Sequence, residues 1–121
     1  MKTRLYSFVF LAIVAAFDSS RSIQIVQSGR LGNCSSPTLG QAVDRVFSSL
    51  DWTASKASGE LAGSVLVYAN GTLQFKGQET DAQLQFVVNE QTGSFDVVAL
   101  RLNGVSQSNE IMTAFFAKAC E

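Results

Sequence analysis

Few side chains in this sequence could do acid–base, nucleophilic or metal chemistry. The 121 residues include no histidine, which removes the usual general base near neutral pH and the commonest metal ligand. Two carboxylate pairs have suitable spacing, Asp44 with Asp51 and Glu79 with Asp81, but no pattern places either pair in a shared apolar cleft. We therefore predict no catalytic, metal-binding or cofactor-binding residues and a protein that is not an enzyme.

The two cysteines, Cys34 and Cys120, are the remaining reactive side chains. In an oxidising compartment an isolated pair most often forms a disulfide, so we predict a Cys34–Cys120 bridge. Closing so long a loop would stabilise the domain by about 4–5 kcal/mol in the chain-entropy treatment. The alternative, two buried free thiols, stays open.

The N-terminus has the layout of a secretory signal. Lys2 and Arg4 precede an apolar run of about a dozen residues that ends in small side chains, as signal peptides do. A membrane anchor would need about 20 apolar residues. We expect a signal peptide over 1–16, cleavage after Ala16, and a periplasmic or secreted chain with no membrane span.

Charge argues against a nucleic-acid partner. Removing Lys2 and Arg4 leaves seven of the nine cations against ten acids, a formal charge of −3. A surface that binds phosphates needs the opposite sign, and the remaining cations are spread along the sequence. We predict a protein partner and no nucleic acid.

Local signals predict the elements of the first half of the chain. The alternation over Ser22–Gln27 predicts a strand, and the capping box of Thr38 and Gln41 begins a helix expected over 39–50. Asn70-Gly71 is the strongest short-range hairpin signal and predicts a turn between two strands. The strands of this half that follow the helix are expected at 52–57, 64–69 and 72–76.

The second half begins with a polar connection predicted over Gly77–Asp81. Strands are expected over Ala82–Val88 and Ser94–Leu102, with a turn over Asn89–Gly93 between them. Ser108 is a suitable N-cap for a final amphipathic helix that reaches Cys120.

This order of elements is typical of an α+β domain. We expect a single antiparallel β-sheet of four to five strands with two helices packed on one face. The length has room for one domain, so residues 17–121 should form a single compact unit. Trp52 follows the predicted helix directly, and we expect its ring to cover the end of the helix's apolar stripe and to belong to the core.

Several short blocks resemble those of small bacterial exported proteins and lipoproteins of uncharacterised function. The blocks are Thr38–Phe47 with Trp52 behind it, Leu84–Asn89 followed by Gly93–Phe95, and Leu102–Gly104. The resemblance implies an envelope setting and a helix-on-sheet fold similar to β-lactamase-inhibitor-like or cystatin-like architectures. It transfers no catalytic residue, and this chain lacks the cysteine needed for lipidation.

These observations favour an exported, non-enzymatic protein-binding module, with an inhibitor or immunity-type protein as a specialised form. The alternative is a structural accessory subunit of a bacterial envelope or secretion assembly. Strand edges and the tip predicted at Asn70-Gly71 are the candidate partner surfaces, because exposed edges invite strand addition.

Overall fold

The computed structural model describes residues 19–30 and 37–120. They form an α+β fold with one five-stranded antiparallel sheet in the order β1-β2-β3-β4-β5. The strands are β1 (Ser48–Lys56), β2 (Val65–Phe75), β3 (Gln78–Asn89), β4 (Ser94–Leu102) and β5 (Val105–Ser106). The helices are α2 (Ser19–Ser28), α3 (Leu39–Val46) and α4 (Asn109–Ala119), with a short 3₁₀ turn η1 (Gly59–Leu61) between β1 and β2. The predicted signal peptide over 1–16 lies outside the described residues.

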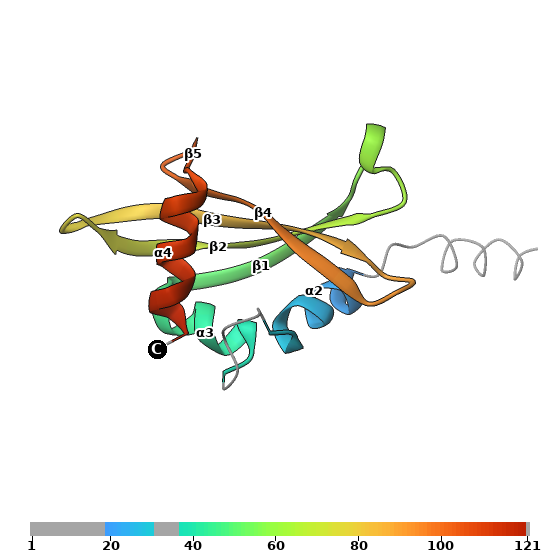
Figure 1. The fold of residues 1–121 in the computed structure, drawn as a ribbon, viewed down its shortest axis with the longest axis horizontal. Helices are drawn as coiled ribbons and strands as arrows, with labels where there is room; N and C mark the ends of the chain where they lie inside the picture. Colours follow the sequence, from blue (N-terminus) through green and yellow to red (C-terminus); the bar gives the residue numbers. More distant parts are fainter. Residues whose placement is uncertain (1–18, 31–36, 121) are drawn as a thin grey trace, which may run out of the picture.

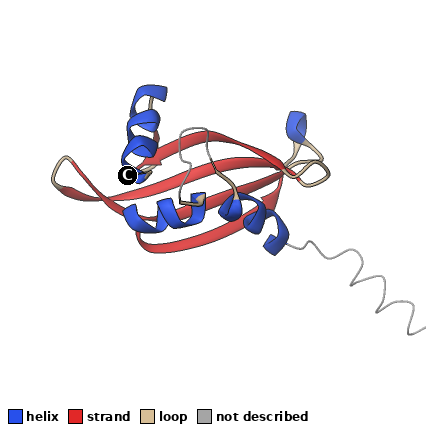
Figure 2. Cartoon of the chain, turned by 60° about the horizontal axis from the view of Figure 1, so that its bottom comes forward, coloured by secondary structure: helices blue, strands red, loops and turns tan. Residues whose placement is uncertain are grey.

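The three α-helices cover one face of the sheet. α2 and α3 lie along the strands, and α4 crosses them steeply towards one end (Figures 1 and 2). Side chains alternate along β2 and β3, so that every second residue faces the helices. The core therefore lies between sheet and helices and includes Val67, Ala69, Leu84, Phe86 and Val88, all fully buried. This confirms the predicted α+β class and its single antiparallel sheet.

The helix α3 begins where its capping box predicts. The Thr38 hydroxyl accepts from the Gln41 amide at 3.3 Å, and the Gln41 side chain accepts from the Thr38 amide at 2.9 Å. The prediction that this helix reaches Leu50 is wrong, because Phe47 is already extended with φ −89° and ψ 139°. Ser48 then pairs with Thr72 of β2. The position of Leu50 agrees with the helical period, and it agrees equally with the alternation of a strand in which Leu50 and Trp52 face the core.

The strand predicted over Ser22–Gln27 is also wrong, since these residues lie within α2. Ser22 and Val26 are both fully buried, and residues four apart share one face of a helix. The Ser22 hydroxyl donates to the Glu90 carboxylate in the turn between β3 and β4. This tertiary contact and the packing of Val26 override the β-branched composition of so short a segment.

The hairpin predicted at Asn70-Gly71 is the third error. β2 continues through both residues to Phe75, and the turn falls at Lys76 and Gly77, which have φ values of 54° and 79°. Both values suit a two-residue hairpin turn. A Cβ atom on Gly71 would lie 2.7 Å from the Ser48 carbonyl oxygen, so this glycine allows close approach to a neighbouring strand instead of making a turn.

In the segment predicted as a polar connection over Gly77–Asp81, only Gly77 belongs to a turn, and the other four residues begin β3. Thr80 is buried, with 6% of its surface exposed, and pairs with Leu73 of β2. Its hydroxyl donates to the Gln78 carbonyl oxygen at 3.1 Å, which satisfies a polar group that would otherwise be costly to bury. The strand therefore extends four residues further towards the N-terminus than its apolar alternation indicates.

The other predictions for the second half agree with the structure. β4 spans the predicted Ser94–Leu102, and the Asn89 side chain accepts from the Gln91 amide at 2.9 Å in the turn before it. Ser108 caps α4 by accepting from the Ile111 amide at 3.3 Å. The two-residue strand β5 has no sequence signal long enough to predict it. Within residues 19–30 and 37–120, no helix has the length and apolar character needed to cross a bilayer.

Candidate functional site

The side of the sheet away from the helices, here called the open face, carries ordered rows of side chains. Strand register places one row across four strands, in the order Asp51, Asn70, Gln83 and Arg101. The next row, one pleat along, contains Thr53, Tyr68, Gln85 and Ala99. Antiparallel sheets often leave one face in water, and no helix of the described chain covers this one (Figure 2).

Five of these side chains form a continuous hydrogen-bonded set, the polar ladder: Thr53, Asn70, Gln83, Gln85 and Arg101. The Asn70 amide donates to the Thr53 hydroxyl at 3.3 Å, and Nε2 of Gln83 donates to Oδ1 of Asn70 at 2.9 Å. Nη1 of Arg101 donates to Oε1 of Gln83 at 3.2 Å and to Oε1 of Gln85 at 2.7 Å. The ladder therefore links β1, β2, β3 and β4 through side chains alone.

The ladder holds one cationic group, on β4, at the open face. Arg101 is half-buried, and both bonds described for it leave from Nη1. A guanidinium has five donors in a rigid fork. Arg101 thus carries further donors on Nε and Nη2 beyond the two bonds that hold it in the ladder.

Apolar side chains continue the open face beyond the ladder. Leu66 pairs with Val87 across β2 and β3, and both are half-buried beside Tyr68. The register of β3 against β4 shifts between Gln85 and Phe86. This bulge leaves Val98 46% exposed, an unusual exposure for an apolar residue in a strand interior.

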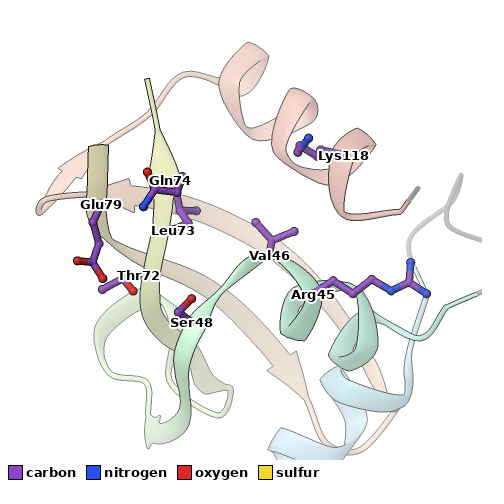
Figure 3. Close-up of a pocket in the computed structure, with 8 residues that line it drawn as sticks. All are labelled: Arg45, Val46, Ser48, Thr72, Leu73, Gln74, Glu79 and Lys118. Atoms are coloured by element: carbon purple, nitrogen blue, oxygen red, sulfur yellow. The ribbon is translucent and has the colours of Figure 1, made fainter. Parts of the chain in front are cut away.

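A second feature lies on the helix side of the sheet, where a trough runs beside α4. Its inner lobe, of about 250 Å³, is lined by Val46, Leu73, Gln74, Phe75, Leu100, Leu102, Ile111, Ala114, Phe115 and Lys118. Its outer lobe, of about 230 Å³, is lined by Arg45, Val46, Ser48, Thr72, Leu73, Gln74, Glu79 and Lys118 (Figure 3). Val46, Leu73, Gln74 and Lys118 line both lobes, so the two lobes adjoin.

The carboxylates considered for acid–base chemistry lie apart from any shared apolar cleft. Asp44 is exposed on α3 and Asp51 on the open face, while Glu79 and Asp81 are exposed on β3. Within the described ranges, no three Asp, Glu, Cys or His side chains gather closely enough to hold a metal ion.

The predicted disulfide falls partly outside the structure described. Cys120 forms the C-cap of α4 and is half-buried, whereas Cys34 lies outside the described residues. The Cys34–Cys120 pairing therefore stays a prediction.

Trp52 packs on the core, as expected, but by a different contact. Its ring stacks on Phe86 with centroids 6.1 Å apart and planes at 24°, and it is partly buried against the main apolar cluster. Phe86 lies on β3, the middle strand of the sheet, so Trp52 covers the sheet and not the end of the helical stripe.

The polar ladder was missed at the sequence level although part of its signal was present. Gln83 and Gln85 alternate with Ala82, Leu84 and Phe86, which places both amides on one face of a strand. The turn predicted at Asn70 takes this residue out of the predicted strand, although Asn70 is the residue that connects the two glutamines to β1.

Comparisons with known proteins give no relative from which a role could be transferred: no family model, no curated protein and no solved structure matches this chain. The resemblance of residues 38–121 to small exported proteins of the bacterial envelope accordingly stays a prediction.

Proposed function

We propose that this chain is an exported, non-enzymatic protein-binding module that engages its partner through the open face of the sheet. The observation that carries the proposal is the ordered surface formed by Tyr68, Leu66, Val87 and Arg101. Tyrosine and arginine are among the residue types enriched at the energetic anchors of interfaces. Here both are held by neighbouring strands, so little side-chain entropy would be lost on binding.

The charge of the open face indicates the kind of partner. Three exposed carboxylates, Asp51, Asp81 and Asp96, share the open face with the guanidinium of Arg101. A basic protein surface would complement this pattern, whereas a second copy of the same face would bring like charges together. The favoured partner is therefore a different, basic protein in the periplasm or outside the cell, as an inhibitor or immunity-type role would require.

The outer edge of β4 supports the second candidate, an accessory subunit of an envelope or secretion assembly. In the described part of the chain β5 pairs only with Arg101 and Leu102, and the strand order places no strand beside residues 94–99. Such an edge can accept a strand from another subunit. The bulge at Val98 twists this edge, which makes it a poorer template for an added strand. The open face is therefore the better supported partner surface.

Site-specific photo-crosslinking in the producing cells tests the proposal. A photoreactive phenylalanine analogue at Tyr68 should give one adduct of defined mass, and the same analogue at Gln24, exposed on α2, should not. Charge reversal of the acids, with Asp51→Lys and Asp96→Lys combined, should abolish the Tyr68 adduct. Adducts that form equally from Gln24, or only from residues 94–99, would contradict binding by the open face; the second result would favour the assembly subunit.

A further inference from the structure

The inner lobe of the trough has the character of a ligand pocket. Eight of its ten lining residues are apolar, and the two exceptions are Gln74 and Lys118. An enclosed apolar cavity of about 150 Å³ binds benzene, so this open apolar space of about 250 Å³ is large enough for an alkyl group.

The packing of α4 explains why this space exists. Phe115 contacts Phe47 edge-on with ring centroids 5.7 Å apart, and Ala119 is buried against Ala42 of α3. These contacts hold the C-terminal half of α4 on α3. The inner lobe lies between α4, from Ile111 to Lys118, and the core-facing side chains of β2 and β4, Leu73 and Leu100 among them.

The polar groups at the mouth indicate the head group of the ligand. Lys118 lines both lobes and so lies where the apolar space opens, whereas Gln74 follows the core-facing Leu73 in β2 and its amide points away from Val46 (Figure 3). In Figure 3 the guanidinium of Arg45 points away from Leu73, and Glu79 lies across β2 from Lys118. An ammonium beside an apolar channel suits an anionic head with oxygen acceptors.

The size of the inner lobe limits the ligand to one chain. Its 250 Å³ is less than twice the roughly 150 Å³ that accommodates one benzene ring. Two acyl chains of a membrane lipid would therefore not fit. We propose that the trough binds one free single-chain amphiphile with a carboxylate head, such as a medium-chain fatty acid, with its tail in the inner lobe and its head at Lys118.

Calorimetric titration with dodecanoate below its micelle concentration tests this site, with dodecanol as the uncharged analogue. Ala114 and Ala117 are both exposed on α4, but only Ala114 lines the inner lobe. Ala114→Trp should fill the lobe and weaken binding of dodecanoate by about tenfold or more, and Ala117→Trp should leave it unchanged. Thermal melts of both variants show that each is folded.

The head group is tested by Lys118→Met, which keeps the length of the side chain and removes its charge. Because one exposed ion pair contributes little, dodecanoate should bind about three- to fivefold more weakly while dodecanol is unaffected. Lys56→Met, on β1, is the matched control. The proposal is overturned if dodecanoate fails to bind, or if the protein binds only vesicles of anionic diacyl lipid. It is also overturned if Ala117→Trp weakens binding of dodecanoate as much as Ala114→Trp does, or if Lys118→Met weakens binding of dodecanoate and dodecanol equally. None of these results bears on the crosslinks from Tyr68, which report the opposite face.

Discussion

Nε2 of Gln83 donates to Oδ1 of Asn70 across 2.9 Å, joining β3 to β2 on the open face. Both side chains are half-buried, and Asn70 in turn donates to Thr53 of β1. An amide pair of this kind stabilises a sheet directly and also orients its neighbours.

We expect Gln83→Ala to lower the free energy of unfolding by about 1 kcal/mol, the net value of a typical side-chain hydrogen bond. Urea denaturation of Asn70→Ala, Gln83→Ala and the double variant measures the coupling between the two residues. A coupling of about 0.5–1 kcal/mol is expected for residues in direct contact. Additive losses would show that the ladder is not energetically connected.

Gly71→Ala should destabilise the domain by about 1–3 kcal/mol, as overpacking does. The new methyl group would lie 2.7 Å from the Ser48 carbonyl oxygen and 3.1 Å from Cδ2 of Phe47, and the backbone of β1 has little freedom to retreat. Thr72→Ala, at the next residue of β2, is the control and should cost less. Chemical denaturation that ranks the two variants in the reverse order would contradict the close approach.

Trp52 is the single tryptophan of the chain, so the tryptophan fluorescence of the protein reports the packing of this ring. We expect native emission shifted to the blue that moves to the red on unfolding, because the ring stacks on the fully buried Phe86. Trp52→Ala should cost about 2–3 kcal/mol, below the range for a fully buried aromatic ring, and Trp52→Phe should recover most of that loss. Native emission already red and readily quenched by iodide would place the ring on the surface.

The Cys34–Cys120 bridge predicts a specific cross-linked peptide. Mass spectrometry of exported protein, digested without reduction, should recover the two cysteine-containing peptides joined, and reduction should lower thermal stability through the lost loop constraint. Two thiols that react with an alkylating agent in native protein would rule the bridge out.

The apolar N-terminal run predicts a processed chain. N-terminal sequencing of protein from the periplasm or the culture medium should begin near Phe17. Replacing Val9 and Leu11 by arginine should interrupt the apolar run and retain the precursor in the cytoplasm. Recovery of the unsubstituted protein from the cytoplasm with Met1 intact would contradict the prediction of a signal peptide.

Elements with strong local signals were predictable from sequence. The capping box at Thr38, the N-cap at Ser108 and the alternation over Ser94–Leu102 each act between residues a few positions apart, so their effect does not depend on the rest of the fold. The α+β class and the single antiparallel sheet follow from the order of such elements.

Tertiary structure decided the rest, since the same local pattern admits two conformations. Ser22–Gln27 is helical because Ser22 and Val26 both meet the core and Ser22 reaches Glu90, 68 positions away. Asn70-Gly71 stays in a strand because β1 passes close to Gly71. The polar ladder and the trough beside α4 likewise depend on strand register and helix placement. These are set by long-range packing, whose energy no local window of sequence contains.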